Sequence, residues 1–390
     1  MKSNIFNNGN LKFDSKILFK QIYHIFHTGE GMAHGPSHLN FWMPYFDCVY
    51  DYTIILVRNL ELYHWVMDNY PKFSIVYAKN GTDVDSFFSN LHYCRNVYYS
   101  SNTGNTLHTL KFNELKHIFL GHGDSDKSAS AHKYFRAYDE IWVAGQAHID
   151  RFKNAGFPIE QMQFVKVGRP SLRKILEIGE QHWSKRMLIN FLYLPTWEGV
   201  YEEGNYSSVE ISDQILYLLS SLFPNSNINV KFHPVTGSRD DRFKDIGQFL
   251  KSEFNQNEKV LDVWDKEVSV DTLISRSNIF ICDISAVVSE CLAANSPLFV
   301  YIPKDKDINI LKSDMEYHDY AYTFSSIEEL SLLIERVVLN NDDFLQDSRL
   351  KAIEYILSRN ATVSCVFENE LRDVISKNSK LPNYLTVLRQ

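Results

Sequence analysis

The chain has 390 residues, 44% hydrophobic and 23% charged, with 40 Lys+Arg against 48 Asp+Glu and a net charge of −8. This is a globular composition, long enough for two domains, and its negative charge disfavours nucleic acid as a partner. No stretch approaches the ~20 apolar residues of a membrane-spanning helix, and the N-terminus lacks an apolar signal region. Five widely spaced cysteines without a CxxC pair indicate reduced, mostly buried thiols. We therefore expect a cytoplasmic protein and exclude secreted, transmembrane, zinc-ribbon and disulfide-scaffold classes.

The N-terminal segment Phe13–Phe26 spaces its apolar residues helically. We expect a helix that packs on its own domain; a helix lying on a membrane surface is the alternative. Four histidines crowd this region, and we interpret them as surface or acceptor-cleft residues because their spacing defines no metal geometry. They are His24, His27, His34 and His38.

Short apolar runs alternate with amphipathic stretches through the rest of the chain, which is typical of parallel α/β units. The strands predicted in the first half are Thr53–Val57, Phe73–Tyr77, Asn96–Tyr99, His117–Leu120, Glu140–Ala144 and Gln163–Val167. Helical patterns cover Leu60–Asn69 and Gln146–Asn154. A charged, strand-free stretch from Lys174 to Lys185 is the candidate linker, so we predict an N-terminal Rossmann-like domain over residues 1–180.

The same alternation restarts after the linker. The strands predicted there are Leu188–Leu194, Ile228–Phe232, Lys259–Leu261, Ile279–Cys282 and Leu298–Tyr301. The helices predicted between and after them are Ser212–Leu222, Asp241–Phe254, Val287–Ala294 and Ile327–Leu339. We predict a second Rossmann-like domain over residues 186–390, with the last helix packing back on the first domain. Two doubly wound domains facing each other across a cleft would place ligands beyond the carboxyl ends of the strands.

Histidines follow two of these predicted strands. His122 begins a segment that also contains Gly123, Ser125 and Lys127, directly after the run His117–Leu120. A histidine in that position is suited to general-base catalysis because its pKa lies near neutrality. His233 ends the segment Lys231-Phe232-His233-Pro234 and would face His122 across the cleft. For either histidine alone, a structural role in a turn is the simpler interpretation.

Two further clusters follow predicted strands. Pro195-Thr196 closes one strand, and Asp283-Ile284-Ser285-Ala286 leads from another strand into a helix with small first residues. The free N–H groups at such a helix start favour a pyrophosphate. Glu290 lies about one and a half turns beyond Ser285, where a carboxylate would reach ribose hydroxyls. Taken singly, Ser285 is better interpreted as a plain N-cap and Glu290 as a solvated helix residue than as functional residues.

In this order and spacing the clusters resemble the CDP-glycerol glycerophosphotransferase family, which includes teichoic-acid primases, polymerases and relatives in capsule synthesis. The resemblance runs from about His117 to Tyr301. The matching residues are His122, Gly123 and Lys127; Tyr138-Asp139; Gly168 and Pro170; Pro195-Thr196-Trp197; Lys231 with His233-Pro234; and Asp283, Ser285 and Pro297. Ala286 stands where the family commonly has a second serine, and Glu290 where it usually has aspartate.

The resemblance implies a GT-B-like fold and an enzyme that transfers glycerol phosphate from CDP-glycerol to a hydroxyl of a cell-surface glycopolymer or its lipid-linked precursor, releasing CMP. His122 would be the catalytic base and His233 the second catalytic histidine. The implied donor-binding residues are Gly123, Ser125, Lys127, Arg169, Pro195, Thr196, Lys231, Asp283, Ser285, Ala286 and Glu290. No cofactor is required, although Mg²⁺ on the pyrophosphate is compatible with this chemistry. A lipid-linked saccharide or polyol-phosphate acceptor would bring the protein peripherally to the inner membrane surface.

Two other functions fit the same residues. A GT-B glycosyltransferase or epimerase would use a sugar nucleotide, because a serine-to-glutamate spacing of this kind also suits UDP-sugars. A non-catalytic nucleotide-binding subunit would keep the fold without turnover, and the presence of both His122 and His233 argues against it.

Overall fold

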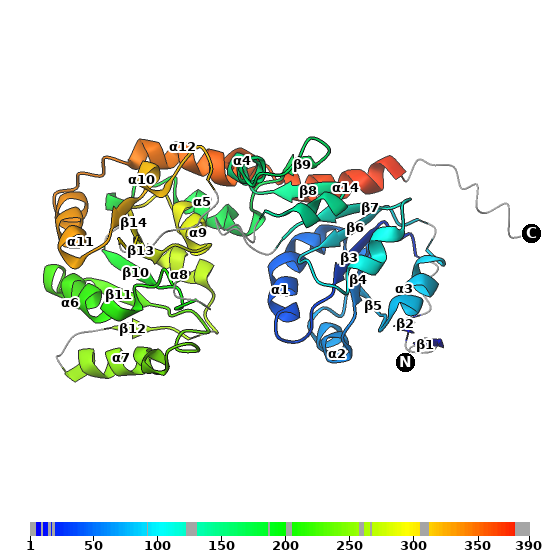
Figure 1. The fold of residues 1–390 in the computed structure, drawn as a ribbon, viewed down its shortest axis with the longest axis horizontal. Coiled ribbons are helices and arrows are strands. Elements are labelled where there is room, and N and C mark those ends of the chain that lie inside the picture. The colour runs from blue at the N-terminus through cyan, green and yellow to red at the C-terminus, as the bar shows by residue number, and fades with distance from the viewer. Residues whose placement is uncertain are drawn as a thin grey trace, which may run out of the picture.

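The computed structural model describes residues 5–8, 11–14, 17, 20–91, 93–121, 131–185, 188–199, 205–256, 261–265, 267–304 and 312–378. The chain forms two lobes, each built on its own sheet, that lie beside each other along the long axis (Figure 1). The first lobe contains nine strands in the order β1-β2-β5-β4-β3-β6-β7-β8-β9, and the second contains six in the order β12-β11-β10-β13-β14-β15. In both sheets the strand order reverses beside the first parallel strand, so both are doubly wound as predicted.

The strands of the first lobe are β1 (Ile5–Asn8), β2 (Leu11–Asp14), β3 (His24–Thr28), β4 (Thr53–Val57), β5 (Ser74–Tyr77), β6 (Asn96–Tyr99), β7 (Lys116–Phe119), β8 (Glu140–Val143) and β9 (Gln163–Lys166). The hairpin β1–β2 adds to β5 in antiparallel fashion, and all other pairs are parallel. Along the parallel strands, successive apolar residues belong to two different hydrophobic clusters. In β4, for example, Ile54 belongs to one cluster and Ile55 to the other. Side chains of successive strand residues point to opposite faces, so both faces of this sheet are covered.

The helices that this half of the chain adds to the sheet are α1 (Gly35–Phe46), α2 (Leu60–Asn69), α3 (Gly81–Phe88) and α4 (Gln146–Asn154). Local capping fixes where two of them begin. Asn59 Oδ1 accepts the Leu62 N–H at 2.8 Å before α2, and Asn80 and Asp83 form a reciprocal capping box at α3.

The helix predicted over Phe13–Phe26 is wrong. The segment contributes β2 and the start of β3, and β3 is a central strand that pairs with β4 and β6. A strand buried on both faces shows a near-continuous apolar pattern, and this pattern mimics helical spacing over a short window. The interpretation of His24 and His27 as surface or cleft residues is wrong for the same reason, because both are fully buried in β3.

The strands of the second lobe are β10 (Asn190–Leu194), β11 (Asn227–Val230), β12 (Asp262–Val263), β13 (Ile279–Asp283), β14 (Leu298–Tyr301) and β15 (Tyr322–Phe324). The helices from the linker onward are α5 (Arg173–Ile178), α6 (Ser212–Leu222), α7 (Ile246–Gln256), α8 (Val270–Arg276), α9 (Val287–Leu292), α10 (Tyr317–Tyr320), α11 (Ile327–Ile334), α12 (Gln346–Leu357), α13 (Arg359–Val363) and α14 (Val366–Asn378).

Three predictions in this half needed correction. The candidate linker contains most of α5, β12 begins one residue after the predicted strand ended, and the helix predicted from Asp241 is a short 3₁₀ turn followed by α7. Residues 259 and 260 of the predicted strand Lys259–Leu261 lie outside the described residues.

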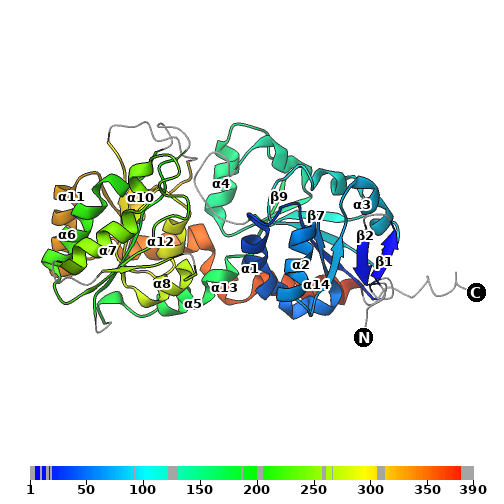
Figure 2. The ribbon, with the colours of Figure 1, turned by 90° about the horizontal axis from the view of Figure 1, so that it is seen from below.

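The chain returns from the second lobe to the first through its last helices (Figure 2). The helix α12 contacts α9 and α10 of the second lobe and also α4 of the first, and α14 then packs against α1. Phe367 anchors α14: its ring is fully buried and lies nearly parallel to Trp42 with centroids 5.1 Å apart. Within the part of the chain that the structure describes, no helix is both long and apolar enough to cross a membrane.

Candidate active site

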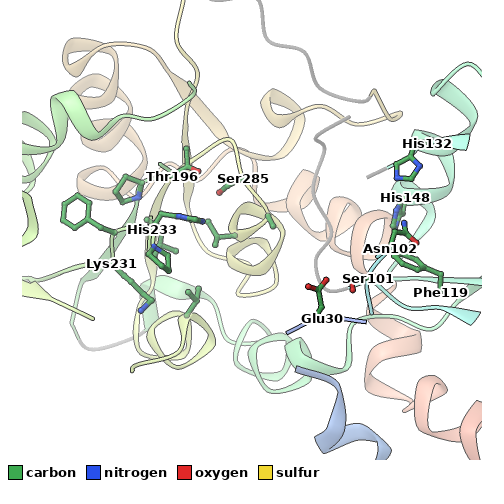
Figure 3. A pocket seen from close by; sticks show the side chains of 18 of the residues that line it. Glu30, Ser101, Asn102, Phe119, His132, His148, Thr196, Lys231, His233 and Ser285 are labelled. Atoms are coloured by element: carbon green, nitrogen blue, oxygen red, sulfur yellow. The ribbon is translucent and has the colours of Figure 1, made fainter. Parts of the chain in front are cut away.

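A cavity of about 630 Å³ lies between the two lobes and is bounded by the carboxyl ends of strands from both sheets. The residues after β3, β6 and β7 form one wall, and those after β10, β11 and β13 form the other. Figure 3 shows the two walls, with Thr196, Lys231, His233 and Ser285 opposite Glu30, Ser101 and Asn102. Each wall lies where its strand order reverses, the usual ligand position in a doubly wound sheet.

The wall contributed by the second lobe contains most of the predicted donor-binding side chains that the structure describes. Six predicted residues line the cavity: Pro195, Thr196, Lys231, His233, Ser285 and Ala286. They come from three loops, which the sheet brings together because β10 lies between β11 and β13. The wall thus combines an ammonium, an imidazole and a hydroxyl, which are groups that bind phosphate oxygens.

Asp283 does not line this cavity, in contrast to its predicted contact with the donor. Its carboxylate is fully buried and accepts hydrogen bonds from the Thr196 N–H at 2.7 Å, the Ser208 N–H at 3.0 Å and the Ser208 hydroxyl at 2.5 Å. Burial raises the pKa of Asp283 to about 7, although the three hydrogen bonds act in the opposite direction. Asp283 is a positioning residue that ties the loops after β10 and before α6 to the end of β13.

His233 lies exposed at the cavity, with its ring nearly parallel to that of Trp197 and centroids 6.3 Å apart. The backbone beyond it is fixed by Glu198, whose Oε1 accepts the Gly237 N–H at 2.8 Å and whose carbonyl accepts the Arg239 guanidinium at 3.0 Å. Glu198 is itself buried. The loops after β10 and β11 therefore position His233 together.

Lys231 lies half-buried between His233 and the β12 edge of the sheet, and its ammonium donates to the Asp265 carbonyl oxygen. Burial lowers the pKa of Lys231, and the Asp265 carboxylate opposes that shift. An ammonium held in a partly dehydrated site interacts more strongly with a phosphate than one in bulk water.

Arg169 and Glu290 lie outside the cavity lining, and their predicted contacts with the donor stay predictions. Arg169 is buried at the junction of the lobes with its guanidinium carbon 5.3 Å from the Phe41 ring centroid. Its Nε and Nη2 have no hydrogen-bond partner among the described residues. Burial raises the pKa of the Glu290 carboxyl, and the charge of Arg169 opposes this rise, so the two groups influence each other across the junction.

The first lobe contributes residues that the sequence did not reveal. Glu30 follows β3, Ser101 and Asn102 follow β6, and His132 and His148 complete this wall. His148 stands in the first turn of α4, directly after β8. Since ligands lie beyond the carboxyl ends of parallel strands, its place at the start of the predicted helix Gln146–Asn154 was a signal for a site residue. Glu30 follows a strand that the sequence assigned to a helix, and no pattern indicated it.

The predicted base His122 and its neighbours Gly123, Ser125 and Lys127 lie outside the described residues. The residues on either side of that segment, Gly121 and His132, line the cavity. The assignment of His122 as catalytic base stays a prediction.

The four N-terminal histidines do not gather into a site. His24 Nδ1 lies 3.2 Å from the Tyr98 hydroxyl and His27 Nδ1 lies 3.1 Å from the Thr109 hydroxyl. Burial lowers the pKa of both His24 and His27 to about 3, so both are neutral. His38 is also buried, on α1. Among the residues that the structure describes, no group of three or more His, Cys, Asp or Glu side chains has the geometry of a metal site.

Two doubly wound domains with a cleft between them form the arrangement of the GT-B fold, in which ligands bind at the strand ends that line the cleft. The wall that faces the first lobe carries lysine, histidine and serine, as a phosphate-containing donor requires. A sequence model of the family described as CDP-glycerol:poly(glycerophosphate) glycerophosphotransferase matches residues 58–321. The chain belongs to this family and is an enzyme of this class.

Solved structures agree on the fold. The wall teichoic acid polymerase TagF superimposes with a TM-score of 0.58 and 14% identity over 94% of this chain and 92% of the TagF chain. A TagF variant soaked with CDPG gives a TM-score of 0.58 and 13% identity over 94% and 92%. HepE of Anabaena in complex with UDP gives a TM-score of 0.53 and 8% identity over 91% and 100%. No curated protein sequence matches the chain. These likenesses confirm the predicted GT-B-like fold.

Proposed function

We propose that the cavity holds CDP-glycerol with its pyrophosphate against Lys231, His233 and Ser285, and that the glycerol phosphate is transferred to a hydroxyl presented from the first lobe. The observation that supports this proposal is the convergence of these three side chains from separate strand ends on one wall of one cavity. Lys231 and His233 lie far from Ser285 in the sequence, and only the fold brings the three side chains to the same wall.

The acceptor oxygen attacks the β-phosphorus of CDP-glycerol, and the bond from that phosphorus to the bridging oxygen breaks. CMP leaves with the bonding electrons, and the acceptor proton passes to His122. Lys231 and His233 stabilise the negative charge that develops on the leaving phosphate. A general base typically contributes about 10²–10⁴-fold, so positioning and charge stabilisation must supply most of the remaining acceleration.

We propose that the reaction needs no resident metal. The described part of the cavity lining offers a single carboxylate, Glu30, on the wall opposite Lys231, whereas Lys231 supplies a positive charge for the phosphates. Activity should therefore persist in EDTA. A loss of activity in EDTA that Mg²⁺ restores would assign a role to Mg²⁺ on the pyrophosphate instead.

We propose that the acceptor is lipid-linked, either a saccharide or a polyol phosphate of a capsule or teichoic-acid type polymer, and that it brings the enzyme to the inner membrane surface. The enzyme should then sediment with acceptor-bearing membranes and be released by high salt or mild detergent. Release only on full solubilisation of the bilayer would contradict peripheral attachment.

The decisive experiment for the proposed function is a comparison of donors. The purified protein is incubated with CDP-glycerol or with UDP-sugars in the presence of acceptor-bearing membranes, and released CMP and UDP are measured. We expect CMP from CDP-glycerol and no UDP. UDP release without CMP would favour a sugar-nucleotide enzyme, and binding of CDP-glycerol without turnover would favour a non-catalytic subunit.

A further inference from the structure

The wall formed by the first lobe contains a small polar group at its own topological switch point. We define the switch-point triad as Glu30, Ser101 and Asn102, three residues from the loops that follow the adjacent strands β3 and β6. All three line the cavity, opposite Lys231 and His233 (Figure 3).

Each member of the triad offers unused hydrogen-bonding capacity. The Ser101 side chain is 7% exposed, and its hydroxyl has no hydrogen-bond partner among the residues that the structure describes. The Tyr138 hydroxyl donates to Asn102 Oδ1 at 2.5 Å, so the amide N–H groups of Asn102 remain for a ligand. Within the described chain no side chain pairs with the Glu30 carboxylate. A buried hydroxyl without a partner is unfavourable unless a ligand satisfies it.

The loops that carry the triad are fixed in place. Asn105 Nδ2 donates to the Gly29 carbonyl at 3.0 Å, and Arg58 donates to the Asn105 carbonyl at 2.6 Å. A Cβ atom at Gly29 would collide with the Thr103 hydroxyl, so only glycine permits this close approach of the two loops. The triad is therefore preorganised, as a binding site requires.

The chemistry of the triad selects a neutral ligand rich in hydroxyl groups. A carboxylate accepts hydrogen bonds from hydroxyls and repels phosphate, whereas a serine hydroxyl and an amide donate to hydroxyl oxygens. The opposite wall, with Lys231 and His233, has the reverse preference.

Resting on the proposed function, we infer that the switch-point triad binds the neutral vicinal diol at the acceptor terminus. One hydroxyl of that diol attacks the donor phosphate. The glycerol end of a polyol phosphate and the ring of a sugar both supply such a diol. Glu30 then determines specificity by excluding an acceptor that ends in phosphate.

The test measures binding, so it does not depend on turnover. We would use NMR titration with three probes: a glycerol phosphate trimer that ends in glycerol, its analogue that ends in 1,3-propanediol, and methyl glucoside. Wild-type protein should bind the trimer at least about tenfold more tightly than the propanediol analogue, the effect of one hydrogen bond to a charged group. If methyl glucoside binds more tightly than the trimer, the diol comes from a sugar.

Glu30→Gln and Ser101→Ala are the test variants, and Glu61→Gln is the matched control, because Glu61 is an exposed glutamate of the same lobe outside the cavity. Two further probes are CDP and the trimer phosphorylated on its terminal glycerol. Glu30→Gln should weaken the trimer about tenfold and bind the phosphorylated trimer relatively better than wild type does, with the affinity for CDP unchanged. Ser101→Ala should weaken the trimer as well. Equal binding of trimer and analogue by wild type, or wild-type preferences in Glu30→Gln, would overturn the inference. Absence of CMP release by wild type with intact trimer binding would instead count against the proposed function alone.

Discussion

Asp283 at the end of β13 accepts the backbone N–H of Thr196, just beyond the end of β10, at 2.7 Å. These two strands pair with each other and flank the position where the strand order of the second sheet reverses. The hydrogen bond therefore fixes the relative position of two loops that both line the cavity. A buried carboxylate acts here on the architecture of the site rather than on its ligand.

Replacing Asp283 with asparagine tests this role through the pH dependence of stability. Folding raises the pKa of Asp283 from 3.8 to about 7, so between these values the folded protein retains a proton that the unfolded chain releases. The contribution of Asp283 to the free energy of unfolding is thus full below about pH 4 and is lost as the pH rises to about 7.

Urea unfolding of wild type and Asp283→Asn between pH 4 and pH 8 measures this difference. We expect the wild-type stability to fall relative to the variant by up to a few kcal/mol over this range and then to stay level. A constant difference at all pH values would show that the carboxyl does not titrate in that window.

His122 is the second target. His122→Ala should leave the CD spectrum and the affinity for CDP-glycerol nearly unchanged while turnover falls about 10²-fold or more, because a general base acts only in the transition state. His148→Ala is the comparison variant, since His148 also lines the cavity but has no assigned role in proton transfer. CMP release at saturating donor is the measurement, and wild-type turnover in His122→Ala would remove the residue from the mechanism.

The sequence predicts best those elements whose signals are local, that is, set by residues close together in the chain. The strand Thr53–Val57 and the helix Leu60–Asn69 match β4 and α2 residue for residue, because a short apolar run and the Asn59 cap are local signals. The strand-end rule likewise found Lys231, His233 and Ser285, since each follows a strand that was recognised. Local signals and the topology of parallel sheets were sufficient for that wall.

On the other wall, Ser101 and Asn102 follow the correctly predicted strand Asn96–Tyr99, whereas Glu30 was not predictable because the strand before it has no distinctive pattern. With β3 buried on both faces, the sequence around it gave a helical spacing, so Glu30 was not recognised as a strand-end residue. Asp283 presents the opposite problem: its position in a motif was visible, but its burial behind Thr196 and Ser208 depends on loops distant in the sequence.

Ser285 and Glu290 separate transition-state contacts from ground-state binding. Ser285 lines the cavity, and the proposed donor position would place the pyrophosphate against it. Ser285→Ala should therefore lower kcat as well as the affinity for CDP-glycerol. Glu290 lies further along α9 with a partly exposed side chain, and a contact with ribose hydroxyls remains our prediction. Glu290→Gln should then mainly raise KM for CDP-glycerol. The loss of binding free energy should be about 1.5–3 kcal/mol, as for one hydrogen bond to a charged group.

A donor with 2′-deoxyribose provides the control for Glu290. If the carboxylate binds that hydroxyl, the deoxy donor should weaken wild type and have little further effect on Glu290→Gln, the non-additivity of direct partners. Additive losses would show that Glu290 acts from the lobe junction beside Arg169 instead. A fall in kcat at unchanged KM would assign the carboxylate to the chemical step.

The helix α12, which leads the chain back to the first lobe, carries one partner of a buried ion pair. Arg349 on α12 is fully buried and pairs with Asp343, which also accepts hydrogen bonds from the Trp183 indole at 2.8 Å and the Tyr322 hydroxyl at 2.7 Å. Asp343 therefore joins the segment after α5, the strand β15 and the helix α12. Loss of its carboxylate would leave the Arg349 charge buried without its partner.

Asp343→Ala should reduce the free energy of unfolding by about 3–5 kcal/mol, the usual effect of breaking a buried pair. The adjacent Asp342 gives a matched control, because it pairs with Arg336 at 2.7 Å while both side chains are about half exposed. Asp342→Ala should change stability by only about 0–1 kcal/mol, since an exposed pair gains little over hydration. Urea unfolding of both variants measures the two losses in free energy of unfolding. Similar losses would mean that burial does not set the strength of these ion pairs. A large loss in Asp343→Ala alone would show that the buried network of Asp343 with Arg349, Trp183 and Tyr322 contributes strongly to stability.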